Sequence, residues 1–195
     1  MNHRTQERGW SADFEINVDS RCPVMRVVIC GRMHRCKLST LKNTVIGHDA
    51  GRLHPAASIL ARQQVTREWW ATAASRYLLF VSDLVLAECG DGDSDAAIER
   101  LRVIDGIDIL RTTDAANQLA AELIRSHAVP ETEPRDALRI ALSAINGIDY
   151  LATWNFKHIM NPSTQHLIDA VCRNAGIESA VICTPEQLLV IYDDT

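Results

Sequence analysis

The stretch that decides the fold is DYLATWNFKHI, residues 149–159. It begins with a short apolar run, Tyr150–Ala152, and then changes abruptly to polar and charged side chains. Such a run is typical of a buried parallel strand, and open α/β sheets bind their ligands just past the carboxyl ends of the strands. We therefore expect the polar residues that follow the run, beginning with Thr153 and Asn155, to lie at a ligand-binding edge.

From residue 56 onward, apolar runs of strand length alternate with segments of helical composition. Strands separated by helices indicate a parallel sheet covered on both faces, so we expect an α/β protein with a central parallel sheet in a three-layer α/β/α arrangement. The expected strands are residues 77–81, 107–110, 150–152 and 181–183; the expected helices are 56–76, one capped by Ser82, 94–104, 113–126, one beginning near Pro134, one ending at Gly176 and one capped by Thr184.

The chain before Pro55 has a different character. Met25–Ile29 predicts a first strand, whereas Cys30–His54 is rich in Arg, Lys and His and has neither strand nor helix periodicity, so it is assigned no structure. We expect a poorly structured extension over residues 1–24, one domain over 25–190 in which 25–55 is atypical, and a tail over 191–195.

Size and charge set broad limits. A chain of 195 residues that is 47% hydrophobic and 23% charged can bury the core of one domain. The formal net charge of −5 gives no overall basic signature, so a nucleic acid would have to be held by a local patch or through metal ions. The sequence has no apolar run of membrane-spanning length and a polar beginning, which predicts a cytoplasmic protein without a membrane partner.

The six cysteines contain no C-x-x-C pair, which favours reduced thiols over a disulfide framework. One alternative is a zinc site. Cys30, His34, Cys36 and His48 have the right donor atoms, but their spacing matches no familiar zinc knuckle.

Two acids and an amide are expected at the carboxyl edge of the sheet. Glu88 lies on the helix after one strand, Asp136 lies in the first turn of a helix that precedes another, and Asn155 follows that second strand. Magnesium and manganese prefer such oxygen ligands, and a bound ion could orient a water for attack on a phosphodiester. Each acid also has an interpretation that involves no metal. Glu88 could be a solvated helix residue, and Asp136 could be a partner of the helix dipole.

Four motifs together resemble the PIN domain family. They are SDLVLAE at residues 82–88, DALRIA at 136–141, the opening stretch at 149–159 and ICTPE at 182–186. The resemblance runs from about residue 57 to residue 189, and the order and spacing of the motifs make it more specific than any one motif. It implies a compact α/β/α fold and a magnesium- or manganese-dependent endoribonuclease, most often the VapC-type toxin of a toxin–antitoxin pair. RNA is then the implied substrate, with an antitoxin protein and a second copy of the chain as implied partners.

The resemblance also implies roles for individual residues. Glu88 and Asp136 would be metal-ligating catalytic acids, Asn155 would stand at the position of the fourth acid, and Thr153 would be the hydroxyl beside it. An amide can donate a carbonyl oxygen to a metal but brings no negative charge.

The chain departs from the family at its first motif. PIN domains begin with a strand that ends in an acid, whereas here Met25–Ile29 is followed by Cys30-Gly31-Arg32. One hypothesis is a reading-frame error, because permitted codons for Cys30–Ser39, shifted by one nucleotide, encode Val-Glu-Gly-Cys-Ile-Val-Ala-Ser-Tyr. The alternative is a catalytically impaired PIN fold that acts as a binding or structural module.

The remaining basic residues have two interpretations each. Lys157 and His158 are predicted either to contact phosphate or to fix the loop through hydrogen bonds. A solvated helix face is predicted for four arginines, with a local phosphate-binding surface as the alternative: Arg62, Arg67, Arg135 and Arg139.

Overall fold

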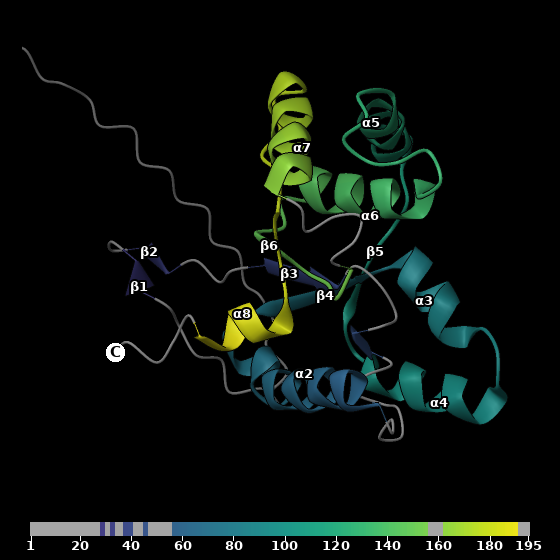
Figure 1. The fold of residues 1–195 in the computed structure, drawn as a ribbon. Helices are drawn as coiled ribbons and strands as arrows, with labels where there is room; N and C mark the ends of the chain where they lie inside the picture. Colours follow the sequence, from purple (N-terminus) through teal and green to yellow (C-terminus); the bar gives the residue numbers. More distant parts are fainter. Residues whose placement is uncertain are drawn as a thin grey trace, which may run out of the picture.

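The computed structural model describes residues 28–29, 32–33, 37–40, 45–46, 56–155 and 162–190. Figure 1 shows helices packed above and below a central sheet. None of the helices in these ranges is long and apolar enough to cross a membrane.

A five-stranded sheet with the order β5-β4-β3-β6-β7 forms the centre of the fold. Every neighbouring pair in it is parallel, as the alternation of strands and helices predicts. Its strands are β3 (Lys37–Thr40), β4 (Leu78–Ser82), β5 (Asp108–Leu110), β6 (Tyr150–Ala152) and β7 (Val181–Cys183).

Helices cover both faces of this sheet, so the three-layer α/β/α architecture is confirmed (Figure 1). One layer contains α5 (Asp114–Arg125), α6 (Pro134–Ile145) and α7 (Pro162–Asn174). The other contains α2 (Ala57–Arg76), α3 (Asp83–Gly90), α4 (Ser94–Val103) and α8 (Pro185–Val190).

Alternation along the strands divides the core between the two layers. Leu151 and Ile182 face the layer of α5, α6 and α7, whereas their neighbours Ala152 and Cys183 pack with Trp69 and Leu188 from α2 and α8. Successive side chains of a strand point to opposite faces, and both faces here are buried. Strands β4, β6 and β7 therefore carry apolar residues at nearly every position, which is why they read as continuous apolar runs.

The prediction of a first strand at Met25–Ile29 is wrong for the central sheet. Val28–Ile29 forms β1, which pairs antiparallel with β2 (Arg32–Met33) in a separate two-stranded sheet. The central position belongs to β3, inside the segment to which the sequence assigned no structure. With Lys37, Ser39 and Thr40 around Leu38, this short strand carries little apolar signal, and its pairing on both sides with β4 and β6 defines it instead.

The strand order reverses at β3. The chain runs outward from β3 to β4 and β5 and then crosses back to place β6 and β7 on the other side. The last residues of β3, β6 and β7 are in register with one another; they are Thr40, Ala152 and Cys183. In open parallel sheets the crevice beyond such a reversal is where ligands bind, so the topology itself directs attention to this edge.

Candidate functional site

The predicted site residues come from three elements at the carboxyl edge of the sheet. Glu88 lies on α3, which starts directly after β4 because the Ser82 hydroxyl accepts a hydrogen bond from the Val85 amide, 3.2 Å away. Asp136 lies in the first turn of α6, where Pro134 begins the helix and a carboxylate is favoured by the helix dipole. Thr153 and Asn155 follow β6.

An arginine joins the two acids. The Arg139 guanidinium donates through Nη1 to Asp136 Oδ1 at 2.9 Å and through Nη2 to Glu88 Oε1. Arg139 and Asp136 are almost completely buried, with 1% and 0% of their side chains exposed, and Glu88 retains 17%. Arg135, which is mostly exposed, approaches the same Glu88 oxygen at 3.5 Å.

The segment after β6 completes the cluster. Asn155 donates from Nδ2 to the second oxygen of Asp136, Oδ2, at 2.8 Å. The buried Thr153 hydroxyl accepts a hydrogen bond from the backbone N–H of Asn155 at 3.0 Å. This contact holds the asparagine close to the acid. Glu88, Asp136, Asn155 and Thr153 therefore form one connected group, with Arg139 between the two acids.

Trp154 anchors this segment to the opposite helical layer. Its indole Nε1 donates to the Thr66 hydroxyl on α2 at 2.9 Å, and the Arg62 guanidinium lies over its ring at 5.6 Å from the centroid. Trp154 belongs to the buried cluster around Trp69. Arg62 thus stacks on a buried tryptophan, which is neither of the two interpretations given to it from the sequence.

Arg139 is the functional-site residue that sequence reasoning assigned wrongly. The solvated helix face predicted for it is incorrect, because its side chain is buried. A signal was present in the sequence: Arg139 lies in Ala137–Ile145, a run that is apolar on nearly all sides of the helix, and such a helix is buried all round. An arginine inside it needs a partner, and the acid one turn earlier, Asp136, is the nearest candidate.

The donor atoms suit a divalent metal, but their arrangement in this structure does not. Both Asp136 oxygens accept hydrogen bonds, and Arg139 and Arg135 both contact Oε1 of Glu88. Among the residues that the structure describes, no group of three or more His, Cys, Asp or Glu side chains is placed to hold a metal ion. As arranged, the cluster is a neutralised ion-pair network and not an open set of metal ligands.

Several sequence predictions fall outside the described residues. They are the basic pair Lys157 and His158, the proposed zinc donors Cys30, His34, Cys36 and His48, and the position at Cys30–Gly31 where the first acid was expected. Of the central strand β3, Lys37–Thr40 supplies no acid.

The buried thiol beside the site is not a nucleophile. Burial raises the pKa of Cys89 to about 11, and the neighbouring Glu88 charge adds to the rise while Arg100 opposes it. A thiol with this pKa is protonated near neutral pH, and the protonated form is unreactive.

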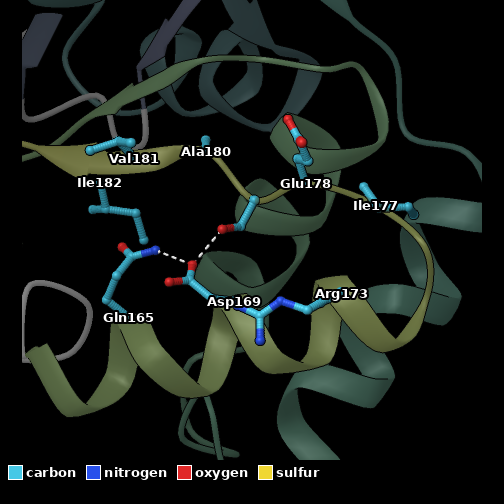
Figure 2. Close-up of a pocket in the computed structure, with 9 residues that line it drawn as sticks. Gln165, Asp169, Arg173, Ile177, Glu178, Ala180, Val181 and Ile182 are labelled. Atoms are coloured by element: carbon cyan, nitrogen blue, oxygen red, sulfur yellow. Dashed lines mark hydrogen bonds between the residues drawn. The ribbon is translucent and has the colours of Figure 1, made fainter.

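A groove lies elsewhere, between α7 and β7. Figure 2 shows Asp169 between Gln165 and Arg173 on the helix, facing Ala180–Ile182. Its volume is about 540 Å³, and Asp169 accepts hydrogen bonds from Gln165 at 2.7 Å and from Ser179. None of the predicted site residues lines this groove.

The chain matches no protein family and no curated protein. Its structure is similar to a chain in the crystal structure of VapBC2 from Rickettsia felis bound to a DNA fragment from their promoter. The TM-score is 0.44 and the identity 13%, over 75% of this chain and 98% of that chain. A likeness of this size does not show family membership.

Proposed function

We propose that this chain is a PIN-like, metal-dependent endoribonuclease and the toxin component of a toxin–antitoxin pair. The observation that supports the proposal is the convergence of Glu88, Asp136, Asn155 and Thr153. These residues come from three separate motifs of the PIN resemblance and meet where the order of the parallel strands reverses.

The proposed ligands of a magnesium or manganese ion are Glu88, Asp136 and Asn155. Such an ion, when bound, neutralises phosphate charge and lowers the pKa of a coordinated water. Around it, the chain supplies the Thr153 hydroxyl and the exposed Arg135, whose guanidinium suits a phosphate of RNA. RNA as substrate, an antitoxin and a second copy of the chain as partners, and a cytoplasmic location belong to the same proposal.

A ribonuclease assay tests the proposal directly. Purified protein is incubated with a long RNA and about 10 mM MnCl₂, a concentration high enough to load weak millimolar sites, and the products are compared with those of Asp136→Ala and Asp169→Asn. We expect slow cleavage by the unaltered chain and by Asp169→Asn, because Asp169 lies in the groove outside the cluster. Asp136→Ala should be inactive. Equal activity in Asp136→Ala would point to a contaminating nuclease, and no cleavage in any sample would sink the proposal.

One observation favours a second candidate, a PIN-like protein that binds without cleaving. Arg139 already binds both acids, Asn155 brings no charge, and β3 supplies no acid. Such a protein would bind an antitoxin or RNA while leaving the RNA intact. RNA binding in a gel-shift assay without cleavage by the unaltered chain would favour this candidate over the first.

The first acid can be sought in the gene. The reading-frame hypothesis places a Glu codon in the shifted frame across codons 31 and 32, followed by an apolar segment. Resequencing the gene would test it: a shifted frame without that acid and apolar run removes the hypothesis. A corrected reading would change the chain before residue 55 and leave Glu88 and Asp136 as they stand.

A further inference from the structure

We infer that Arg139 is the resident cation of the acid pair: its guanidinium competes with a divalent metal for Glu88 and Asp136, so removing it increases the metal affinity of the site. The inference rests on the proposed function in one respect only, that this acid pair is where a metal would bind. It concerns a residue of this chain that the sequence placed on a solvated surface.

The contacts of Arg139 support the inference. Its Nη1 lies 2.9 Å from Asp136 Oδ1, and its Nη2 donates to Glu88 Oε1, so one guanidinium binds a carboxylate 3 residues away in the chain and another 51 residues away. Charge-assisted contacts of this kind are about twice as strong as neutral hydrogen bonds. A metal ion that used the same two oxygens would have to displace both contacts.

Burial makes the competition severe. Arg139 is 1% exposed and Asp136 is 0% exposed, so neither charge is screened by water. Arginine remains protonated at every accessible pH, and two positive charges in contact inside a protein repel strongly. The guanidinium and a divalent ion therefore exclude one another at this position.

The third nitrogen of the Arg139 guanidinium, Nε, makes no hydrogen bond to any residue that the structure describes. This nitrogen is also buried. A buried donor without a partner is unfavourable, and it persists only where other contacts of the same group outweigh it. The outweighing contacts are those to the two acids.

A purely structural ion pair would share these contacts, so the two interpretations must be separated by metal binding. If Arg139 only stabilises α6 against α3, replacing it lowers stability and creates no metal site. If Arg139 competes with a metal, replacing it frees two buried carboxylates that need a cation. Methionine is the replacement of choice because it keeps the length and apolar volume of the arginine stem while removing its charge.

Calorimetric titration with MnCl₂ tests the inference on four proteins: the full chain, Arg139→Met, Asp136→Asn and the double variant Arg139→Met/Asp136→Asn. We expect no saturable site in the full chain below about 1 mM. Arg139→Met should bind one manganese ion roughly 10- to 100-fold more tightly than the full chain does, which is the usual size of the coupling between two sites that affect each other. The double variant should lose this tighter binding, and Mn²⁺ should raise the melting temperature of Arg139→Met alone.

Two results would overturn the inference. One is a tight manganese site in the full chain that Asp136→Asn abolishes, and the other is a folded Arg139→Met that binds no tighter than the full chain. Should Arg139→Met fail to fold by circular dichroism, Arg139→Gln, which also removes the charge but keeps a polar side chain, takes its place in the same titrations, and the same two results would overturn the inference.

The metal readout is independent of catalysis. A new manganese site in Arg139→Met without RNA cleavage by any variant would leave the inference standing and sink the proposed nuclease function. Cleavage by the full chain that Asp136→Ala abolishes, with equal manganese affinity in the full chain and Arg139→Met, would do the reverse.

Discussion

Two acids of this protein sit in contrasting surroundings. Asp136, at the carboxyl edge of the sheet, is completely buried, and its partners are the buried Arg139 and Asn155. Asp169, in the groove beside β7, is half-buried and accepts hydrogen bonds from the neutral side chains of Gln165 and Ser179 (Figure 2).

The difference follows from solvation. A carboxylate that keeps contact with water needs only neutral donors, whereas one that loses all contact requires a compensating charge inside the protein. At the carboxyl edge of the sheet, the buried Arg139 supplies that charge. A metal ion at this edge would have to take the place of that charge, which is the basis of our inference about Arg139.

The largest difference between the two regions is expected when one arginine is removed from each. Arg139→Met leaves Glu88 and Asp136 without their shared cation and should lower the free energy of unfolding by about 3–5 kcal/mol in metal-free buffer. Arg173→Met, at an exposed position in the groove, should change it by less than about 0.5 kcal/mol. Urea unfolding measures both values, and similar losses would remove the contrast between the two regions.

The acids themselves come next. Asp136→Asn removes a buried charge from beside Arg139 and should lower the free energy of unfolding by about 3 kcal/mol. Asp169→Asn keeps most of its hydrogen bonding to neutral partners and should lower it by about 1 kcal/mol or less. The comparison fails if Asp169→Asn proves the more destabilising substitution in the same urea titrations.

A single hydrogen bond in each region provides a third test. Thr66→Val takes the acceptor away from the buried Trp154 Nε1, and an unsatisfied buried donor should cost about 1–3 kcal/mol of unfolding free energy. Ser179→Ala removes a donor from the half-buried Asp169, which water can replace, so the loss should stay below about 1 kcal/mol. Thermal melts of both variants give the order, and a larger loss for Ser179→Ala would contradict it.

The smallest effect concerns two buried thiols, Cys89 beside Glu88 and Cys172 near Asp169. Burial raises the pKa of Cys89 to about 11 and also raises that of Cys172, with Glu88 and Asp169 adding to the respective rises. In the unfolded chain both thiols ionise near their ordinary value of 9.0.

The pH dependence follows from this difference. Below pH 9 the thiols are protonated in both the folded and the unfolded chain, so they contribute no pH dependence to the free energy of unfolding. Above it the unfolded chain releases protons that the folded chain keeps, so stability falls as pH rises toward 11. Urea unfolding at pH 8 and pH 10 measures the fall, and Cys89→Ala should reduce it. An equal slope in that variant would contradict the assignment to Cys89.

The part of the fold that the sequence predicted correctly is the part specified by local pattern. From residue 56 onward, apolar runs, helix caps such as Ser82 and Thr113, and Pro134 at a helix start are read from a few neighbouring residues. The central strand β3 could not be read this way. Only Leu38 in it is strongly apolar, and its place depends on pairing with β4 and β6, the latter more than 100 residues away.

The site divides in the same manner. The gathering of Glu88, Asp136 and Asn155 was predictable, because the carboxyl ends of parallel strands meet at one edge. Arg139 was not recognised, because a charged residue on a helix is usually solvated. Its burial depends on Glu88, a partner 51 residues distant. The sequence therefore indicated which acids meet and missed the charge that holds them.

The measurement that tests the central claim most directly is the anomalous scattering of manganese in crystals grown with about 1 mM MnCl₂, a concentration at which a site of ordinary affinity would be filled. The account predicts no manganese peak between Glu88 and Asp136 in the unaltered chain, with the Arg139 guanidinium in contact with both carboxylates, and a peak there in Arg139→Met. A manganese ion bound by Glu88 and Asp136 in the unaltered chain, with Arg139 displaced, would contradict it.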